Sequence, residues 1–176
     1  MSRIRDWRGW LLVLSALIIL LDRLTKLWVS HHIVEGNVVV VIPRVFAISH
    51  VMNPGAAFSM FTDSPNPART RALLVAFSLF AALVVFIILL RIGRRLSLTA
   101  VSMALVLGGA IGNVWDRIAY GTVIDFLEVH IIHYHWPDFN VADSAIVIGG
   151  VLLLIDSIRP RNQESTDTPQ MTANKN

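Results

Sequence analysis

The stretch "ALLVAFSLFAALVVFIILL" (residues 72–90) decides the structural class of this chain. It contains no charged side chain, and its length approaches the roughly 20 residues that a helix needs to cross a bilayer. A soluble protein would have to bury nearly all of these side chains in a core, whereas lipid tails solvate them directly. The stretch therefore predicts a membrane-spanning helix.

The composition of the whole chain agrees with this prediction. Of its 176 residues, 55% are hydrophobic and only 15% are charged, and the mean hydropathy is +0.62. The length suits one domain, but a soluble domain of this size could not bury so much apolar surface. Because the chain has no cysteine, disulfides, thiolate metal sites and a cysteine nucleophile are excluded. The net charge of +3 favours nucleic-acid binding only if the basic residues form one face, and here they gather at the ends of apolar runs.

Three further apolar stretches accompany residues 72–90. They cover about residues 10–29, 98–116 and 142–158. The first follows a basic N-terminus, as a signal peptide does, but no small-residue cleavage site comes after it, so we interpret it as an uncleaved span. We therefore expect a four-transmembrane-helix bundle that forms a single membrane-embedded domain over residues 1–158.

The basic residues predict how this bundle is oriented, because Arg and Lys are enriched in cytoplasmic segments. Arginines adjoin the ends of the predicted spans at Arg3, Arg5, Arg8, Arg91, Arg94, Arg95, Arg159 and Arg161. With four spans, all of them fall on one side, which places both termini in the cytoplasm. Residues 30–70 and 117–141 then lie outside, and the polar residues 159–176 are expected to form a disordered cytoplasmic tail.

The outer segment 30–70 has strand signals of its own. "NVVVVI" (37–42) and "RVFAISHVM" (44–52) have strand composition, and Pro43 separates them. "NPG" (53–55) is typical of a turn, in which Gly55 is free to adopt a positive φ. The expected fold is thus an all-α membrane protein with a small β-sheet and loops on its outer surface.

The first span carries ionisable residues, which are expensive inside a membrane and normally face protein or water. Asp22 and Lys26 are four residues apart with the acid first, the favourable order for an ion pair. They are expected either to lock the helix to its neighbours or to act directly in catalysis. Ser30 lies on the same helical face as Lys26, which leaves a Ser-Lys nucleophilic dyad as a weaker alternative.

The third span ends in "LGGAIGNVWDRIAYG" (107–121). Gly108 and Gly112 form a small-xxx-small pattern, which is typical of close helix packing. A polar group follows at the outer end of the span, formed by Asn113, Asp116 and Arg117. These side chains form either an Asp–Arg pair with a snorkelling arginine or a polar clamp for a substrate.

Two aspartates lie near the outer ends of the third and fourth spans. Asp125 in "VIDFL" has apolar neighbours, so burial is expected to raise its pKa. Asp143 in "FNVADS" has a simpler explanation, because Asn140 can cap the fourth helix and place Asp143 at the N3 position. Since the two spans are consecutive and antiparallel, both acids are expected at a similar depth. Two adjacent carboxylates cannot both ionise easily, which provides the one base and one acid that an aspartyl hydrolase requires.

Other interpretations of these residues stay open. "HIIHYHWPD" (130–138) offers His130, His133 and His135 as zinc ligands, although it lacks the helix and glutamate of the common zinc hydrolase motif. Its aromatic residues favour an interfacial loop. A proton-coupled membrane carrier would also use acids in a membrane, but at mid-membrane depth. A non-catalytic assembly protein would use the glycines for packing and the acids as helix caps.

Five short motifs together resemble lipoprotein signal peptidase, also called signal peptidase II. They are "LLDRLTK" (20–26), "NPGAAF" (53–58), "GGAIGNVWDR" (108–117), "VIDF" (123–126) and "FNVADS" (139–144). Each motif is weak alone, but five in this order are specific, and the resemblance covers residues 10–158.

The resemblance implies an aspartic endopeptidase of the bacterial inner membrane, with its active site at the periplasmic interface and its sheet on the periplasmic surface. Such an enzyme removes the signal peptide from prolipoproteins that bear a diacylglyceryl-modified Cys, and it cleaves just before that Cys. The implied partners are these substrates, membrane lipid and globomycin-type inhibitors, but no nucleic acid. No cofactor and no metal are implied.

The resemblance also assigns roles to individual residues. The catalytic pair corresponds to Asp125 and Asp143. The substrate-binding residues correspond to Asn53, Gly55, Gly108, Asn113, Arg117 and Asn140. Structural support is assigned to Asp22, Lys26 and Asp116.

Overall fold

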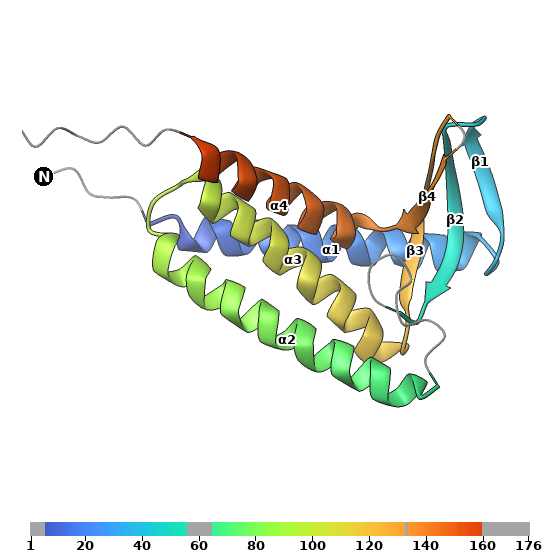
Figure 1. The fold of residues 1–176 in the computed structure, drawn as a ribbon, viewed down its shortest axis with the longest axis horizontal. Helices are drawn as coiled ribbons and strands as arrows, with labels where there is room; N and C mark the ends of the chain where they lie inside the picture. Colours follow the sequence, from blue (N-terminus) through green and yellow to red (C-terminus); the bar gives the residue numbers. More distant parts are fainter. Residues whose placement is uncertain (1–5, 56–64, 133, 160–176) are drawn as a thin grey trace, which may run out of the picture.

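The computed structural model describes residues 6–55, 65–132 and 134–159. Within this part of the chain, four long helices lie along one another and a four-stranded sheet stands at one end of them (Figure 1). The helices are α1 (Arg8–His32), α2 (Pro67–Ile92), α3 (Leu98–Ala119) and α4 (Val141–Ile158). The strands are β1 (Val38–Ile42), β2 (Phe46–Asn53), β3 (Val123–Ile131) and β4 (Tyr134–Phe139).

Three of the helices begin at a capping side chain. Asn66 accepts a hydrogen bond from the backbone of Arg69 at 3.1 Å before α2, and Ser97 accepts one from Ala100 at 3.1 Å before α3. Asn140 caps α4 in the way that the sequence predicts. Because these caps satisfy backbone N–H groups that lack a partner within the helix, they define where each helix starts. Each predicted span lies almost wholly within one of the four helices.

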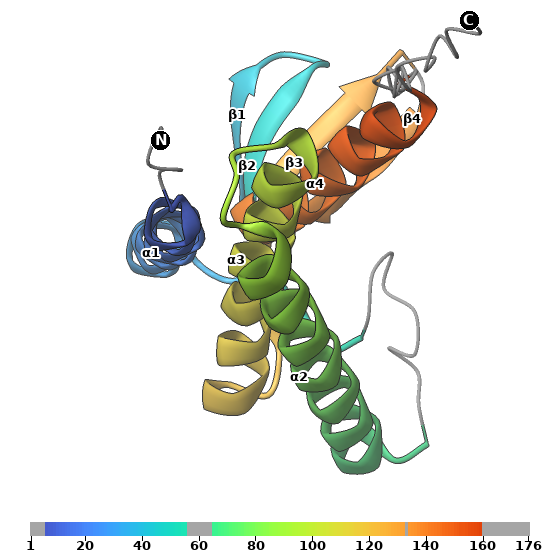
Figure 2. The same ribbon diagram turned by 90° about the vertical axis from the view of Figure 1, so that its left-hand side faces the viewer.

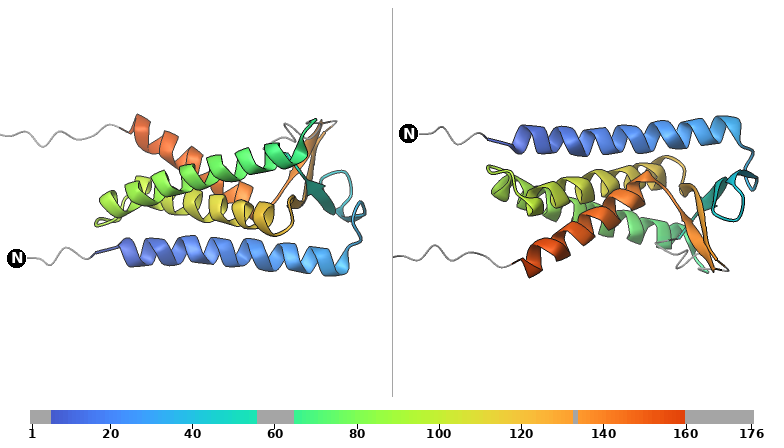
Figure 3. Two further views of the ribbon diagram at one scale, coloured as in Figure 1. Left: turned by 90° about the horizontal axis from the view of Figure 1, so that it is seen from below. Right: turned by 90° about the horizontal axis from the view of Figure 1, so that it is seen from above.

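Helix α3 is the centre of the bundle and packs against α1, α2 and α4 (Figures 2 and 3). Glycines make this close packing possible, as the small-xxx-small pattern predicts. A Cβ atom at Gly108 would lie 2.8 Å from the Ser15 carbonyl oxygen of α1. A Cβ atom at Gly109 would lie 2.3 Å from the Ala142 carbonyl oxygen of α4. The backbones of three helices therefore meet along one glycine-rich face.

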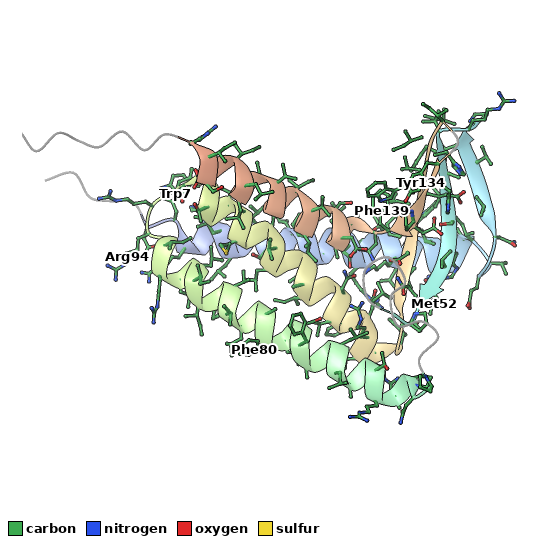
Figure 4. All side chains as sticks on the ribbon, in the orientation of Figure 1. Trp7, Met52, Phe80, Arg94, Tyr134 and Phe139 are labelled. Atoms are coloured by element: carbon green, nitrogen blue, oxygen red, sulfur yellow. The ribbon has the colours of Figure 1, made fainter. Side chains whose placement is uncertain are left out.

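The outer surfaces of the bundle are apolar. Within the described residues, α2, α3 and α4 are long and apolar enough to cross a membrane, and the most apolar window of α2 has a mean hydropathy of 3.2. Phe77 and Phe80 of α2 are 72% and 65% exposed, and Phe80 points away from the bundle (Figure 4). Helix α1 is continuous, but charged residues at positions 22, 23 and 26 interrupt its apolar sequence. The apolar outer surface of the bundle, which includes Phe77 and Phe80, suits lipid and not water.

The sheet is larger than the sequence predicts. Strands β1 and β2 occupy the two predicted strand segments, but residues 117–141 do not form loops alone. They form the antiparallel pair β3 and β4, and β3 pairs with β2 to give the order β1-β2-β3-β4. The expected interfacial loop at 130–138 is therefore wrong. Its Pro137 is tolerated because β4 is an edge strand of the sheet.

Several of the arginines lie at one end of the helical bundle. The start of α1, the α2–α3 turn at residues 93–97 and the end of α4 all lie at the end opposite the sheet (Figure 1). Arg94 and Trp7 mark this end in Figure 4. The remaining arginines of the expected cluster and the expected tail, Arg3, Arg5, Arg161 and residues 160–176, lie outside the described residues.

Candidate active site

Asp125 is a buried carboxylate on strand β3. Helix α3 ends at Ala119, and Gly121 with a φ of +83° turns the chain into the strand. Asp125 therefore lies beyond the outer end of the third span, as expected, but on a strand that the sequence analysis did not predict. Its Oδ2 atom accepts a hydrogen bond from Asn53 Nδ2 at 2.9 Å, and its Oδ1 atom accepts one from Asn140 Nδ2 at 2.8 Å.

Asp143 lies in the first turn of α4 and forms the predicted capping box with Asn140. The Asn140 Oδ1 atom accepts a hydrogen bond from the Asp143 backbone at 2.9 Å, and Asp143 Oδ2 accepts one from the Asn140 backbone at 3.3 Å. Its other oxygen, Oδ1, accepts a hydrogen bond from Asn113 Nδ2 at 2.7 Å. The cap thus holds the carboxylate in a fixed position at the start of the helix.

Two asparagine side chains connect the two aspartates. Asn140 Nδ2 donates both to Asp125 and, at 3.2 Å, to Asn113 Oδ1, and Asn113 Nδ2 in turn donates to Asp143. A continuous path of hydrogen bonds therefore runs from one carboxylate to the other. The structure brings together two acids that are 18 positions apart in the chain, as the sequence analysis expects.

The surroundings of Asp125 change its acidity. Burial raises the pKa of Asp125 from its ordinary value of 3.8 to about 7, because a charged carboxylate is poorly solvated there. The negative charge of Asp143 acts in the same direction, whereas the hydrogen bonds from Asn53 and Asn140 lower the pKa. Near neutral pH, a proton on Asp125 is therefore readily available.

A cavity of about 510 Å³ opens over the two acids, a size that suits a bound ligand. Its polar lining consists of Asn53, Asn113, Arg117, Asp125, Asp138, Asp143 and Ser144. Apolar walls come mainly from β4 and from α4, through Trp136, Pro137, Phe139, Ile146, Val147 and Ile148. A few convergent polar groups among apolar side chains can fix the orientation of an amphipathic ligand.

Arg117 lines one side of the cavity and contacts Gly55, which is not itself among the described lining residues. The Arg117 Nη2 atom donates to the Gly55 carbonyl oxygen at 2.9 Å, and Nη1 donates to the Asn113 carbonyl oxygen at 3.3 Å. The bend at Gly55 forms as an Asx turn, because its N–H donates to Asn53 Oδ1 at 2.9 Å. Gly55 is free to adopt a positive φ but is not among the described residues that do so.

Lys26 forms a buried ionic cluster beneath the asparagines. Its Nζ atom lies 2.8 Å from Asp22 Oδ2, 2.8 Å from Asp116 Oδ2 and 3.1 Å from Asn113 Oδ1. Asp22 Oδ1 also accepts a hydrogen bond from the Ala142 backbone at 2.9 Å and so caps α4 from a neighbouring helix. The expected Asp22–Lys26 pair is present, and it fixes α1 against α3 and α4.

Three sequence-based alternatives do not match these contacts. Asp116 pairs with Lys26 and with Arg23 at 3.2 Å, so the expected Asp–Arg pair with Arg117 does not form. Ser30 Oγ donates to the Leu27 carbonyl oxygen at 3.0 Å, while Lys26 contacts other side chains, so no Ser-Lys dyad forms. Gly108 packs against α1 and is absent from the lining of the cavity over the described residues.

The sequence analysis missed the contribution of β4 to the cavity. Trp136, Pro137 and Phe139 form part of its wall, although the segment was expected to be an interfacial loop. The alternation of Tyr134 and Trp136 is a strand signal, but Pro137 and the histidines obscure it. Arg23 was also left without a role, and it contacts both Asp116 and Tyr120.

Comparison with known proteins agrees with this arrangement. The family model described as signal peptidase (SPase) II matches residues 14–159, which include every residue of the cavity. The chain belongs to the signal peptidase II family. It is therefore a protease of a bacterial membrane-protein family, and the proton-coupled carrier is not favoured.

Individual relatives extend along most of the chain. A lipoprotein signal peptidase of Pseudomonas putida is 44% identical over 152 residues, which are 86% of this chain and 88% of the relative. One from Solibacter usitatus is 46% identical over 151 residues, covering 85% and 90%. A solved structure described as a bacterial membrane enzyme aligns with a TM-score of 0.70 at 26% identity and covers 89% of this chain and 94% of that one.

Proposed function

We propose that this family member is a membrane aspartyl endopeptidase that removes the signal peptide from diacylglyceryl-modified prolipoproteins. In this proposal it cleaves just before the lipid-modified Cys. The observation that carries the proposal is the pair of aspartates, linked through Asn140 and Asn113, at the base of one cavity. The names of the relatives supply the class of substrate.

The chemistry follows from the unequal surroundings of the two acids. Asp143 at a helix N-terminus, where negative charge is favoured, acts as the base and takes a proton from water. Asp125, with a pKa of about 7, holds a proton and donates a hydrogen bond to the scissile carbonyl oxygen. Water adds to the carbonyl carbon, and the tetrahedral intermediate collapses as the nitrogen of the Cys accepts a proton. No covalent bond to the enzyme forms.

The polar lining serves the unwound part of the substrate. A signal peptide can remain helical in the bilayer, but the scissile region must be extended, and its backbone groups then need partners. Asn53, Asn113 and Arg117 present such groups to the cavity. Among the described residues, the buried Arg117 Nε atom donates no hydrogen bond, and we propose that it donates to a substrate carbonyl.

The apolar wall indicates how substrate enters. Val147 and Ile148 of α4 line the cavity and are also 63% and 53% exposed on the outer surface of the bundle. The cavity therefore opens onto the surface that faces lipid, so a substrate can enter sideways while its diacyl chains remain in the bilayer. Globomycin-type cyclic peptides are proposed to bind in the same cavity and inhibit the enzyme.

Four spans in the bacterial inner membrane complete the proposal. Helix α1 buries its charges at positions 22 and 26 against α3 and α4, so it can cross the membrane despite them. Both termini are then cytoplasmic, and the active site and the sheet lie at the periplasmic interface.

The proposal is tested with purified protein and a diacylglyceryl-modified prolipoprotein. We expect Asp125→Asn and Asp143→Asn each to lower the cleavage rate by roughly 10²-fold or more, the scale of lost acid–base catalysis. Asp156→Asn is the matched control, because Asp156 lies at the far end of α4 and contacts Thr99. Substantial turnover by either active-site variant would sink the aspartyl mechanism.

A further inference from the structure

A second cluster of reactive side chains lies on the β3–β4 hairpin. Glu128, His130 and His135 each present a ligand atom, and these atoms all lie within 4.8 Å of one another. The cluster contains neither Asp125 nor Asp143, so the proposed mechanism does not use it. It differs from the three-histidine zinc site considered from the sequence, because Glu128 takes part and His133 lies outside the described residues.

The pairing of the two strands creates this cluster. His130 of β3 lies directly opposite His135 of β4 in the antiparallel register. Glu128 comes two positions before His130, so both side chains lie on the same face of the strand. A shift of register between Leu127 and Val129 leaves Asp138 near the same group. The hairpin therefore gathers two imidazoles and two carboxylates from only 11 consecutive positions, 128–138.

The separations in this cluster are close to those of a metal site. The Nε2 atoms of His130 and His135 lie 2.7 Å and 3.5 Å from the same oxygen, Glu128 Oε1. Around a tetrahedral zinc ion with bonds of about 2.0–2.1 Å, ligand atoms lie about 3.3 Å apart. The two separations from Glu128 Oε1 lie on either side of that spacing.

The charges around the cluster also favour a cation. Asp138 Oδ1 is buried and accepts no hydrogen bond from the described residues, and His135 Nε2 lies 3.8 Å away. Glu128 and Asp138 bring two carboxylates to this part of the hairpin, and among the described residues neither pairs with a Lys or an Arg. A divalent cation would compensate both.

We propose that Glu128, His130 and His135 bind a divalent transition-metal cation such as Zn²⁺, with Asp138 completing the set of ligands. Two imidazoles and carboxylate oxygens are a ligand set that zinc accepts. The ion would join β4 to β3. Because Trp136 and Phe139 of β4 form part of the cavity wall, the ion would hold that wall in place.

Isothermal titration calorimetry with zinc chloride tests this site. The full chain is purified in detergent without a polyhistidine tag and stripped with a chelator. We expect one zinc ion per chain, with affinity reduced at least about 10-fold in His130→Gln and in His135→Gln. The matched control is His32→Gln, whose ring stacks on Trp28 of α1 and lies outside the cluster. The proposal would be overturned if the unmodified chain bound no zinc. It would also be overturned if both cluster variants bound zinc with the affinity of the unmodified chain.

Chemical protection tests the same site without substitution. Histidines are modified with diethylpyrocarbonate, with and without zinc, and are quantified by mass spectrometry. Zinc should protect His130 and His135 but leave the exposed His31 and His32 reactive. Equal reactivity with and without zinc would mean that the cluster is only a hydrogen-bonded group. Asp125→Asn should bind zinc normally, so failure of this site and failure of the peptidase proposal can be distinguished.

Discussion

At the scale of single residues, Asn140 takes part both in the capping of α4 and in the hydrogen bonds that link Asp143 to Asp125. The oxygen of its side-chain amide caps α4, and the nitrogen donates to Asp125 and to Asn113. Capping of a helix and assembly of an acid pair therefore depend on the two ends of one amide. An acid at the start of an apolar run can serve both purposes because the helix terminus itself forms part of the site.

The acidity of Asp125 predicts the pH dependence of cleavage. Its protonated form is lost as the pH rises through about 7, so kcat/KM should fall above that pH. The hydrogen bond from Asn53 lowers the pKa of Asp125, so Asn53→Leu should raise this pKa and move the alkaline limb to higher pH. A pH–rate profile measures both effects.

A matched variant controls for the loss of an asparagine in general. Asn37→Leu changes an exposed residue before β1 and should leave the alkaline limb in place. An alkaline limb that does not move in Asn53→Leu would show that a group other than Asp125 controls it.

Lys26 should contribute mainly to stability. Lys26→Met leaves Asp22 and Asp116 buried without their shared cation, which should lower the free energy of unfolding by about 3–5 kcal/mol. Thermal unfolding in detergent measures the loss. Arg23→Met is the control, because the Arg23 side chain is 24% exposed and Asp116 retains Lys26, so a smaller loss is expected. Equal losses would contradict a central role for Lys26.

At the scale of secondary-structure elements, the glycine face of α3 determines how closely the helices pack. The sequence pattern predicts that Gly108 and Gly112 pack against a neighbouring helix, but it cannot say which helix each one meets. The structure places Gly108 against α1 and Gly109 against α4. The start of α4, which carries Asp143, thus comes within reach of Asn113 one turn further along α3.

Gly109→Ala should therefore disturb the site as well as the bundle. Its added methyl group would meet the Ala142 backbone, and overpacking of this kind typically costs about 1–3 kcal/mol. Both the unfolding temperature and the cleavage rate should fall. Gly150→Ala is the matched control, because its methyl group meets nothing within 4 Å and alanine favours a helix. An unchanged unfolding temperature in Gly109→Ala would contradict the close approach of α3 and α4.

The strands show where prediction from patterns reaches its limit. β1 and β2 were predictable because β-branched residues cluster there between turn signals. β3 and β4 were not predicted, because Pro137 and several histidines interrupt the alternation expected of strands. β4 exists because it pairs with β3, which pairs in turn with β2 from a distant part of the chain.

At the scale of the whole molecule, the sheet stands at one end of an apolar bundle, and the α2–α3 turn with Arg94 and Arg95 lies at the other end (Figure 1). If the four helices all span the membrane, the arginine-rich end is cytoplasmic and the cavity faces the periplasm. In this proposed topology, water would reach the two aspartates while the middle of the bundle remained in lipid.

Reporter fusions test this topology. Green fluorescent protein fused after residue 159 should fluoresce, and alkaline phosphatase at the same position should be inactive, because the C-terminus is expected in the cytoplasm. Phosphatase fused after residue 36, beyond α1, should be active because that position is expected in the periplasm. An active phosphatase after residue 159 would contradict four spans with both termini inside.

The sequence by itself determined the membrane class, the positions of the helices, the capping of α4 and the candidate acids, because each depends on residues near one another in the chain. Only the tertiary structure decided that Asp125 lies on a strand, that β4 walls the cavity and that Lys26 joins Asp22 to Asp116. Those features depend on contacts between distant segments. No local pattern encodes such contacts, because the burial and the partners that define them exist only after the helices pack and the strands pair.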